Sequence, residues 1–234
     1  MACVEVPEGI PKAAFAGPAV LAWGSGRYRE SDAYLACAPL GSVTQQNAWH
    51  LFTGLDANGN PQWSSDQGSS VALFDQPQVG ELSVMRIEAL GIWLLLYNAG
   101  SPRGINARVA TVPWGPWSDV TIIFDPGWPN LGYGHFMHRP GADRLSDPGQ
   151  EDEPGGEYGP YMIHRYTRAV QPTSGKTVQA QIYFVMSTWN PYNTVLMTAT
   201  IQREVGSRTG AVLLRFRLSS LLPVSSGSAS LAEP

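Results

Sequence analysis

The chain has 234 residues, of which 43% are hydrophobic and only 15% are charged, and 15 basic against 19 acidic side chains give a net charge of −4. This length and apolar fraction suffice for a packed core, and the scattered charges exclude a basic surface for nucleic acid or anionic lipid. The longest apolar runs fall far short of the roughly 20 residues that a membrane helix needs, so we expect no membrane span.

The N-terminus and the cysteines give little direct information on location or cofactors. Residues 1–8 have neither the basic nor the apolar region of a secretory signal, so we expect no signal peptide in this sequence and the localisation stays open. Cys3 and Cys37 are too few for a disulfide framework and lack metal-binding spacing. We therefore expect unpaired, inert thiols and no cofactor.

Helical periodicity is rare in this sequence. Short apolar or alternating runs instead recur between Gly, Pro, Asn and Asp, which favours an all-β fold. The expected strands, in chain order, are 18–23, 31–40, 48–55, 71–74, 81–89, 92–99, 105–112, 121–124, 160–168, 178–189, 193–202 and 211–218. Turn residues support these limits, because 56–60 and 189–193 are typical of hairpin loops and Leu90-Gly91 is typical of a tight turn.

The strands fall into three similar groups, which open near Asp32, Glu81 and Glu157. Units of about 40 to 50 residues with four strands are typical of β-propeller blades. An insertion at 140–156, which we expect to be a mobile acidic loop, explains the longer second interval. We predict one propeller-like domain over 1–224, with three blades and a leading strand, and a flexible tail at 225–234. Its open sheet edges would be covered by a homo-oligomer, a larger assembly or upstream residues.

Two of the repeated carboxylates are candidates for chemistry. The inner strands of a propeller line a central channel, so residues near their starts converge. Two carboxyl groups across a sugar-sized gap are the minimum for glycoside hydrolysis, and we select Asp32 and Glu81 as this pair. The alternative is that each caps a turn or pairs with a nearby arginine, namely Arg27, Arg29 or Arg86. Glu157 is a weaker candidate, since beside the acidic loop it can simply be solvated.

Histidines and aromatic residues add candidates for binding. His135 is expected to contact a sugar hydroxyl or to support a carboxylate, whereas His138 and His164 are expected to be structural. On an extended segment the spacing of His135 and His138 directs them to opposite faces, which argues against a metal site. Six loop aromatics are candidates for a platform on which sugar rings stack: Trp23, Trp128, Tyr133, Tyr158, Trp189 and Tyr192. The segment 64–69 resembles an Asp-box turn, which is a folding element and not a catalytic one.

Several segments, in order, carry a family resemblance: 26–36 (GRYRESDAYLA), 80–84 (GELSV), 91–97 (GIWLLLY), 107–110 (ARVA) with 113–118 (PWGPWS), and 158–161 (YGPY). Over about residues 15–204 the chain resembles glycoside hydrolase family 183, formerly described as a domain of unknown function, whose characterised members are endo-D-arabinanases. The resemblance implies a five-bladed furanosidase-type propeller. It also implies cleavage of D-arabinofuranosyl linkages in mycobacterial arabinogalactan and lipoarabinomannan, outside the cell.

The resemblance also implies roles for individual residues. Glu81 best matches the acid that protonates the leaving oxygen, and Asp32 stands in for the second carboxylate. Arg29, His135, Tyr158 and Trp189 are the expected substrate-binding residues. Family chains generally begin with further acidic strands, so we expect an N-terminally shortened member in which the base or nucleophile can be absent.

Three functions therefore stand in competition. The first is an endo-acting hydrolase of D-arabinan. The second is a non-catalytic carbohydrate-binding propeller that recognises cell-wall glycan within a larger assembly such as a phage particle. The third is a structural propeller with no sugar ligand. The linkage cleaved, the stereochemistry and the oligomeric state stay open at this stage.

Overall fold

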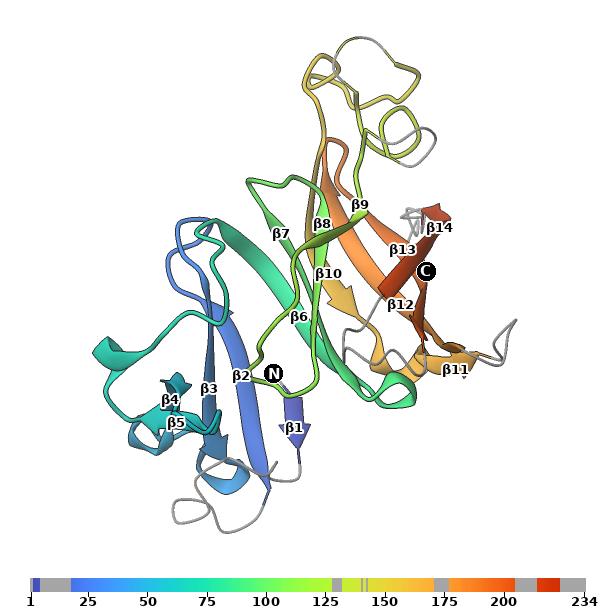
Figure 1. The fold of residues 1–234 in the computed structure, drawn as a ribbon. Helices are drawn as coiled ribbons and strands as arrows, with labels where there is room; N and C mark the ends of the chain where they lie inside the picture. Colours follow the sequence, from blue (N-terminus) through green and yellow to red (C-terminus); the bar gives the residue numbers. More distant parts are fainter. Residues whose placement is uncertain are drawn as a thin grey trace, which may run out of the picture. The chain divides into compact units, whose positions relative to one another are not determined.

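The computed structural model describes residues 2–4, 18–127, 132–139, 141, 143–170, 177–204 and 214–223. In these ranges the regular elements are antiparallel strands and short 3₁₀ turns, without an α-helix (Figure 1). The predicted all-β class is confirmed. In the same part of the chain there is no helix of the length and apolar character needed to cross a bilayer.

The strands form three open antiparallel sheets. The first has the order β1 (Ala2–Val4), β2 (Ala19–Ser25), β3 (Ala33–Pro39), β4 (His50–Leu55) and β5 (Pro61–Ser64). The second has the order β6 (Val79–Ile87), β7 (Ile92–Ala99), β8 (Ile105–Ala110) and β9 (Thr121–Phe124). The third has the order β10 (Gly156–Met162), β12 (Thr177–Trp189), β13 (Asn193–Glu204) and β14 (Leu214–Pro223), and β11 (Arg168–Val170) pairs with β12.

The predicted strand at 71–74 is wrong. The Val71 amide donates to Phe52 and the Leu73 amide donates to Ala33, so the segment touches two strands without forming a ladder with either. Leu73 and Phe74 pack against the core, which explains the strand-like composition, whereas Val71 is exposed. The short strands β1, β5 and β11 were missed, and β5 begins with a proline, which argues locally against a strand.

The predicted group openings are confirmed for the second and third sheets and wrong for the first. Glu81 lies in β6 and Glu157 lies in β10, the first strands of their sheets. Asp32, in contrast, precedes β3, which is paired with β2 along its whole length. The run at 18–23 is therefore part of the first sheet's own hairpin, and Asp32 is not equivalent in position to Glu81.

The chain divides into two compact units, residues 1–122 and 123–234, which are described separately. The prediction of a single domain over 1–224 stays a prediction, and the tail at 225–234 lies outside the described residues.

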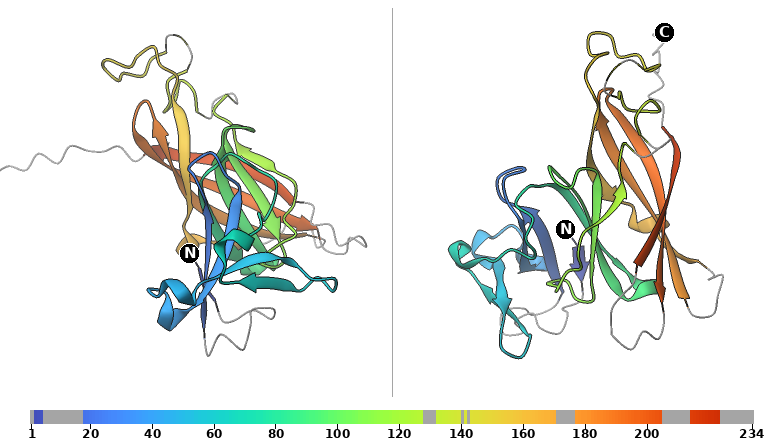
Figure 2. Two further views of the ribbon diagram at one scale, coloured as in Figure 1. Left: turned by 90° about the vertical axis from the view of Figure 1, so that its left-hand side faces the viewer. Right: turned by 45° about the horizontal axis from the view of Figure 1, so that its top comes forward.

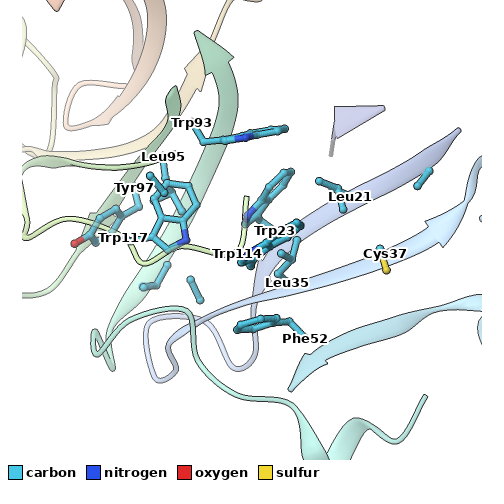
Figure 3. Close-up of a cluster of buried hydrophobic side chains, with 14 of the residues drawn as sticks. Leu21, Trp23, Leu35, Cys37, Phe52, Trp93, Leu95, Tyr97, Trp114 and Trp117 are labelled. Carbon is cyan, nitrogen blue, oxygen red and sulfur yellow. The ribbon is translucent and has the colours of Figure 1, made fainter. Parts of the chain in front are cut away.

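The first unit has an aromatic core to which both of its sheets contribute (Figure 3). The ring centroids of Trp23 and Trp93 lie 5.4 Å apart, and those of Trp63 and Trp114 lie 6.3 Å apart. Trp23 is only 8% exposed and its indole donates to the Pro113 carbonyl, so its assignment to a surface platform is wrong. Most of the described aromatic side chains of this unit belong to this core or pack against it, as expected for large apolar side chains.

Cys37 belongs to the same core and is a free thiol. Burial raises the pKa of this thiol to about 12, so the thiolate needed for reaction is scarce at neutral pH. The prediction of an unpaired, inert thiol is therefore supported for Cys37. The side chain of Cys3 lies outside the described part.

The second unit is dominated by the long β12–β13 hairpin, which Figure 2 shows from two further sides. Along β12 the even-numbered side chains from Ala180 to Thr188 are buried, while the odd-numbered ones are half-buried. This two-residue alternation is that of a sheet with one face on a core and one accessible face.

The described residues of the insertion before β10, 141 and 143–155, form turns and bends and no strand, as predicted. Hydrogen bonds nevertheless hold the insertion to its own unit. The side-chain amide of Asn190 donates to the backbone carbonyls of Gln150 and Glu153, and the backbone amide of Gly155 donates to the backbone carbonyl of His138. The mobility of the insertion stays a prediction.

Candidate functional site

Glu81 lies in a β-bulge at the start of β6. Val79 pairs with Ala99 and Leu82 pairs with Tyr97, so Gly80 and Glu81 together face Asn98 alone. A Cβ atom on Gly80 would lie 2.7 Å from Asn98 Oδ1, so any larger residue here would require a shift of the Asn98 side chain or of the backbone. Bulges of this kind redirect side chains and are frequent beside active sites.

The loop between β2 and β3 docks on this bulge. A turn closes it, since the Glu30 amide donates to Arg27 O at 3.0 Å, and the Gly26 amide donates to Ser31 Oγ at 2.6 Å. Arg29 has a left-handed backbone with φ of 54°, and its amide donates to Val79 O at 3.2 Å. Non-glycine residues adopt this conformation rarely, and those that do are frequently found at binding sites.

Docking of the loop brings Tyr28 to Glu81. The Tyr28 hydroxyl donates to Glu81 Oε1 at 3.0 Å, and the Arg29 guanidinium carbon lies 5.2 Å from the Tyr28 ring centroid. Desolvation raises the pKa of the Tyr28 phenol most, and the hydrogen bond to Glu81 and the charge of Glu81 raise it further. The phenol therefore keeps its proton and remains a donor to the carboxylate.

Two acceptor atoms of the bulge lack partners. Among the described residues, Glu81 Oε2 and Asn98 Oδ1 are buried and have no hydrogen-bond partner. Buried acceptors are nearly always satisfied in native proteins, so two such atoms flanking one glycine need a donor from elsewhere. Sugar hydroxyls are donors of this kind. We name Tyr28, Arg29, Gly80, Glu81 and Asn98 the bulge site.

Asp32 lies at the end of the same loop but is bound differently. Its Oδ1 accepts from the Gln76 amide at 2.7 Å, and the Gln76 side chain in turn contacts Ser101 O and the Tyr97 hydroxyl. The recorded contacts of Asp32 and Glu81 thus run to different partners, and their pairing across a sugar stays a prediction. The alternative arginine partners Arg27 and Arg86 form ion pairs with other carboxylates, Glu30 and Glu88.

The sequence pointed to Glu81 and Arg29 but not to Tyr28 or Asn98 as site residues. An exposed tyrosine between two arginines was a signal for Tyr28. A single polar residue in the buried strand β7 was a signal for Asn98.

In the second unit, Tyr158 and Trp189 share one face of the third sheet. Tyr158 pairs with Ser187 and Trp189 pairs with Gly156, and both side chains are half-buried. Odd-numbered residues of β12 point to the accessible face, so the two aromatics lie on that face as diagonal neighbours.

A second bulge adds Tyr161 to this face. Tyr158 pairs with Ser187 and Tyr161 pairs with Val185, so Gly159 and Pro160 together face Met186 alone, and Gly159 has a φ of 60°. Tyr161 is 66% exposed. Tyr183 follows on β12 and makes an edge contact with the Tyr166 ring, with centroids 6.2 Å apart. We name the side chains of Tyr158, Tyr161, Tyr166, Tyr183 and Trp189 the β10 face.

The remaining candidates of this unit separate into exposed and buried residues. His135 is exposed in a turn closed by its own amide, which donates to Gly132 O. His138 is fully buried with Nδ1 at 3.0 Å from Asp143 Oδ1, in keeping with the structural role expected for it. Glu157 is 6% exposed and lies opposite Thr188, so the solvated alternative for this residue is wrong.

The other platform candidates also differ in position. Tyr192 is exposed in the β12–β13 turn, Tyr133 is half-buried, and Trp128 lies outside the described residues. The segment 64–69 forms a turn in which Asp66 accepts from the Gly68 amide, in keeping with a folding role. The described residues contain no cluster of three His, Cys, Asp or Glu side chains suited to a metal ion.

Comparison with protein-family models identifies a family for this chain. A family model described as a domain of unknown function, DUF4185, matches residues 8–198. No curated protein matches the chain. Because the family match covers most of the sequence and both the bulge site and the β10 face, the chain belongs to the DUF4185 family.

Proposed function

We propose that this protein is a glycoside hydrolase that cleaves D-arabinofuranosyl linkages within cell-wall arabinan, with the bulge site as its active centre. One observation carries the proposal: the Glu81 carboxyl is held at one oxygen by Tyr28, while its second oxygen is buried and has no hydrogen-bond partner among the described residues. A carboxyl fixed at one oxygen with the other left available suits a polyhydroxylated substrate.

The reaction needs one proton donor and one second carboxylate. Glu81 gives its proton to the leaving glycosidic oxygen as the bond from that oxygen to the anomeric carbon breaks. With Oε1 accepting from Tyr28, Oε2 is the oxygen that carries this proton. Asp32 is the candidate for the second role. It either takes a proton from the attacking water or bonds to the anomeric carbon itself; in the second case water then breaks that bond and gives a proton to the Glu81 carboxylate.

The fold is part of the same proposal. We infer that the three open sheets serve as blades of a furanosidase-type propeller. Support comes from the four-stranded meander β6 to β9, from the comparable order of the other two sheets, and from the presence of a bulge in both β6 and β10.

The direct test uses mycobacterial arabinogalactan as substrate. We expect wild-type protein to release a ladder of arabino-oligosaccharides that mass spectrometry resolves, because an endo-acting enzyme cuts at internal linkages. Absence of released oligosaccharide at all protein concentrations would contradict the proposal.

A second candidate function is glycan binding without turnover, and the β10 face favours it. Five aromatic side chains from β10, β12 and the η5 turn (His164–Tyr166) offer rings on one accessible sheet face. This function predicts that the protein binds arabinogalactan without cleaving it. It also predicts that Trp189→Ala weakens binding about fivefold to tenfold, whereas measurable hydrolysis decides against it.

A further inference from the structure

A pocket of about 410 Å³ opens at the β4–β5 edge of the first sheet, on elements separate from the bulge site. It is lined by Gln46, Asn47, Trp49, Leu51, Ser65 and Gln67. These residues come from the η2 turn (Gln46–Ala48), the start of β4, and the turn and η3 segment (Gln67–Ser69) that follow β5. The volume falls in the range of about 300–1,000 Å³ typical of small-ligand pockets.

Local hydrogen bonds fix the backbone and the indole ring that form the two walls of the pocket. On one wall, the Trp49 indole donates to Val43 O at 3.1 Å and the Trp49 amide donates to Gln46 O, which sets the ring. On the other wall, Asp66 accepts from the Gly68 amide at 3.1 Å, and the Ser69 hydroxyl donates to Asp66 O at 2.7 Å. The Asp66 carboxylate is thus used in the turn, and its neighbours Ser65 and Gln67 line the pocket.

The chemistry of the lining selects a class of ligand. All six described lining residues are uncharged, so an anionic or cationic ligand would find no counter-charge among them. Three carboxamides and one hydroxyl supply both donors and acceptors, which suits the adjacent hydroxyls of a sugar. The half-buried indole supplies an apolar surface for the C–H face of a sugar ring.

We propose that this pocket is a carbohydrate-binding subsite for a neutral glycan, separate from the bulge site, that holds the polymer while another segment of it reaches the carboxylates. The inference rests on the proposed function only in its choice of arabinogalactan as the ligand. The Asp-box-like turn at 64–69 then has a binding role in addition to its folding role.

The test is affinity electrophoresis of the full chain in gels that contain soluble arabinogalactan. We expect Trp49→Ala and Gln67→Ala to weaken retardation about fivefold to tenfold relative to wild type. Gln62→Ala is the matched control, since Gln62 is an exposed glutamine on β5 outside the pocket, and it should be retarded like wild type. Thermal unfolding of each variant separates loss of binding from loss of fold, and Gln67→Ala tests the site even if Trp49→Ala fails to fold.

The outcomes separate this inference from the proposed function. Wild-type retardation of folded Trp49→Ala and Gln67→Ala overturns the subsite, and so does the absence of any retardation of wild-type protein. Retardation that depends on Trp49 in a protein that releases no oligosaccharide supports the subsite and contradicts the hydrolase.

Discussion

The hydrogen bond between Tyr28 and Glu81 joins residues 53 positions apart, and the pKa of the Tyr28 phenol is sensitive to it. Desolvation first, then Glu81, raises the pKa of this phenol above its ordinary value of 10.0. The folded state therefore holds the proton more tightly than the unfolded state. The protonated phenol thus stabilises the folded state. This stabilisation is complete below about pH 10 and is lost as the pH rises through the higher pKa of the folded state.

The difference in ultraviolet titration between wild type and Tyr28→Phe measures this pKa. We expect it to lie above the ordinary value and to fall part of the way back in a Glu81→Gln background, because desolvation remains when the charge is removed. A phenol that titrates at the ordinary value in wild type would show that the contact is not formed in solution.

Asp32 has two proposed roles that its variants separate. Asp32→Ala leaves the Gln76 amide without its acceptor and should lower the free energy of unfolding in urea by about 1–3 kcal/mol. Asp32→Asn keeps an oxygen in place and should be much less destabilising. If Asp32 is also the second carboxylate, Asp32→Asn loses hydrolysis while it stays folded. An active Asp32→Asn enzyme would leave this residue only its structural role.

The bulge at the start of β6 makes a prediction at the level of the element. Gly80→Ala places a Cβ 2.7 Å from Asn98 Oδ1, so the buried Asn98 side chain or one of the two strands must shift, and we expect a loss of about 1–3 kcal/mol in unfolding free energy together with reduced turnover. Gly24→Ala is the control, since Gly24 lies in β2 with open space around its Cβ position. Equal stability of the two variants would argue against the bulge.

The insertion before β10 makes a second prediction at this level. Asp143 is only 4% exposed at its side chain, and burial alone would oppose its ionisation. Hydrogen bonds from the Arg139 and Leu145 amides and from His138 outweigh burial and hold the pKa of the carboxyl below its ordinary value. This stabilisation is present above the ordinary carboxyl pKa of 3.8 and is lost as the pH falls through the lower folded value.

Hydrogen exchange measures this anchoring directly. The Arg139 and Leu145 amides should exchange faster in Asp143→Ala than in wild type at neutral pH, while Asp152→Ala, an exposed acid of the same segment, should change neither. Unchanged exchange in Asp143→Ala would mean that the carboxyl does not hold the segment.

At the scale of the whole molecule, local patterns predicted most strands and few long-range contacts. β7 and β9 have the predicted bounds, and β7 is a buried strand between two glycines in which Asn98 interrupts the apolar sequence. The segment 71–74 failed because an apolar composition alone does not specify a pairing partner. The group opening at Asp32 failed because local sequence does not show which arm of a hairpin lies first in its sheet.

The site could be predicted in part for the same reason. Glu81 and Arg29 were selected from the sequence, but the partner of Glu81 depends on the docking of a distant loop. Tyr158 and Tyr161 are three residues apart, so simple alternation places them on opposite faces, and only the bulge brings them to one face. Sequence patterns do not reveal a bulge of this kind, because it is defined by the partner strand.

The central claim is that the Glu81 carboxyl performs the chemistry, and the rate of oligosaccharide release from arabinogalactan by Glu81→Gln tests it most directly. Glu88→Gln is the matched control, because Glu88 follows the same strand and its side chain is 78% exposed. We expect a rate about 10²–10⁴-fold lower for Glu81→Gln, as for loss of a general acid, and an unchanged rate for Glu88→Gln. A folded Glu81→Gln protein that releases oligosaccharides at the wild-type rate would contradict the account.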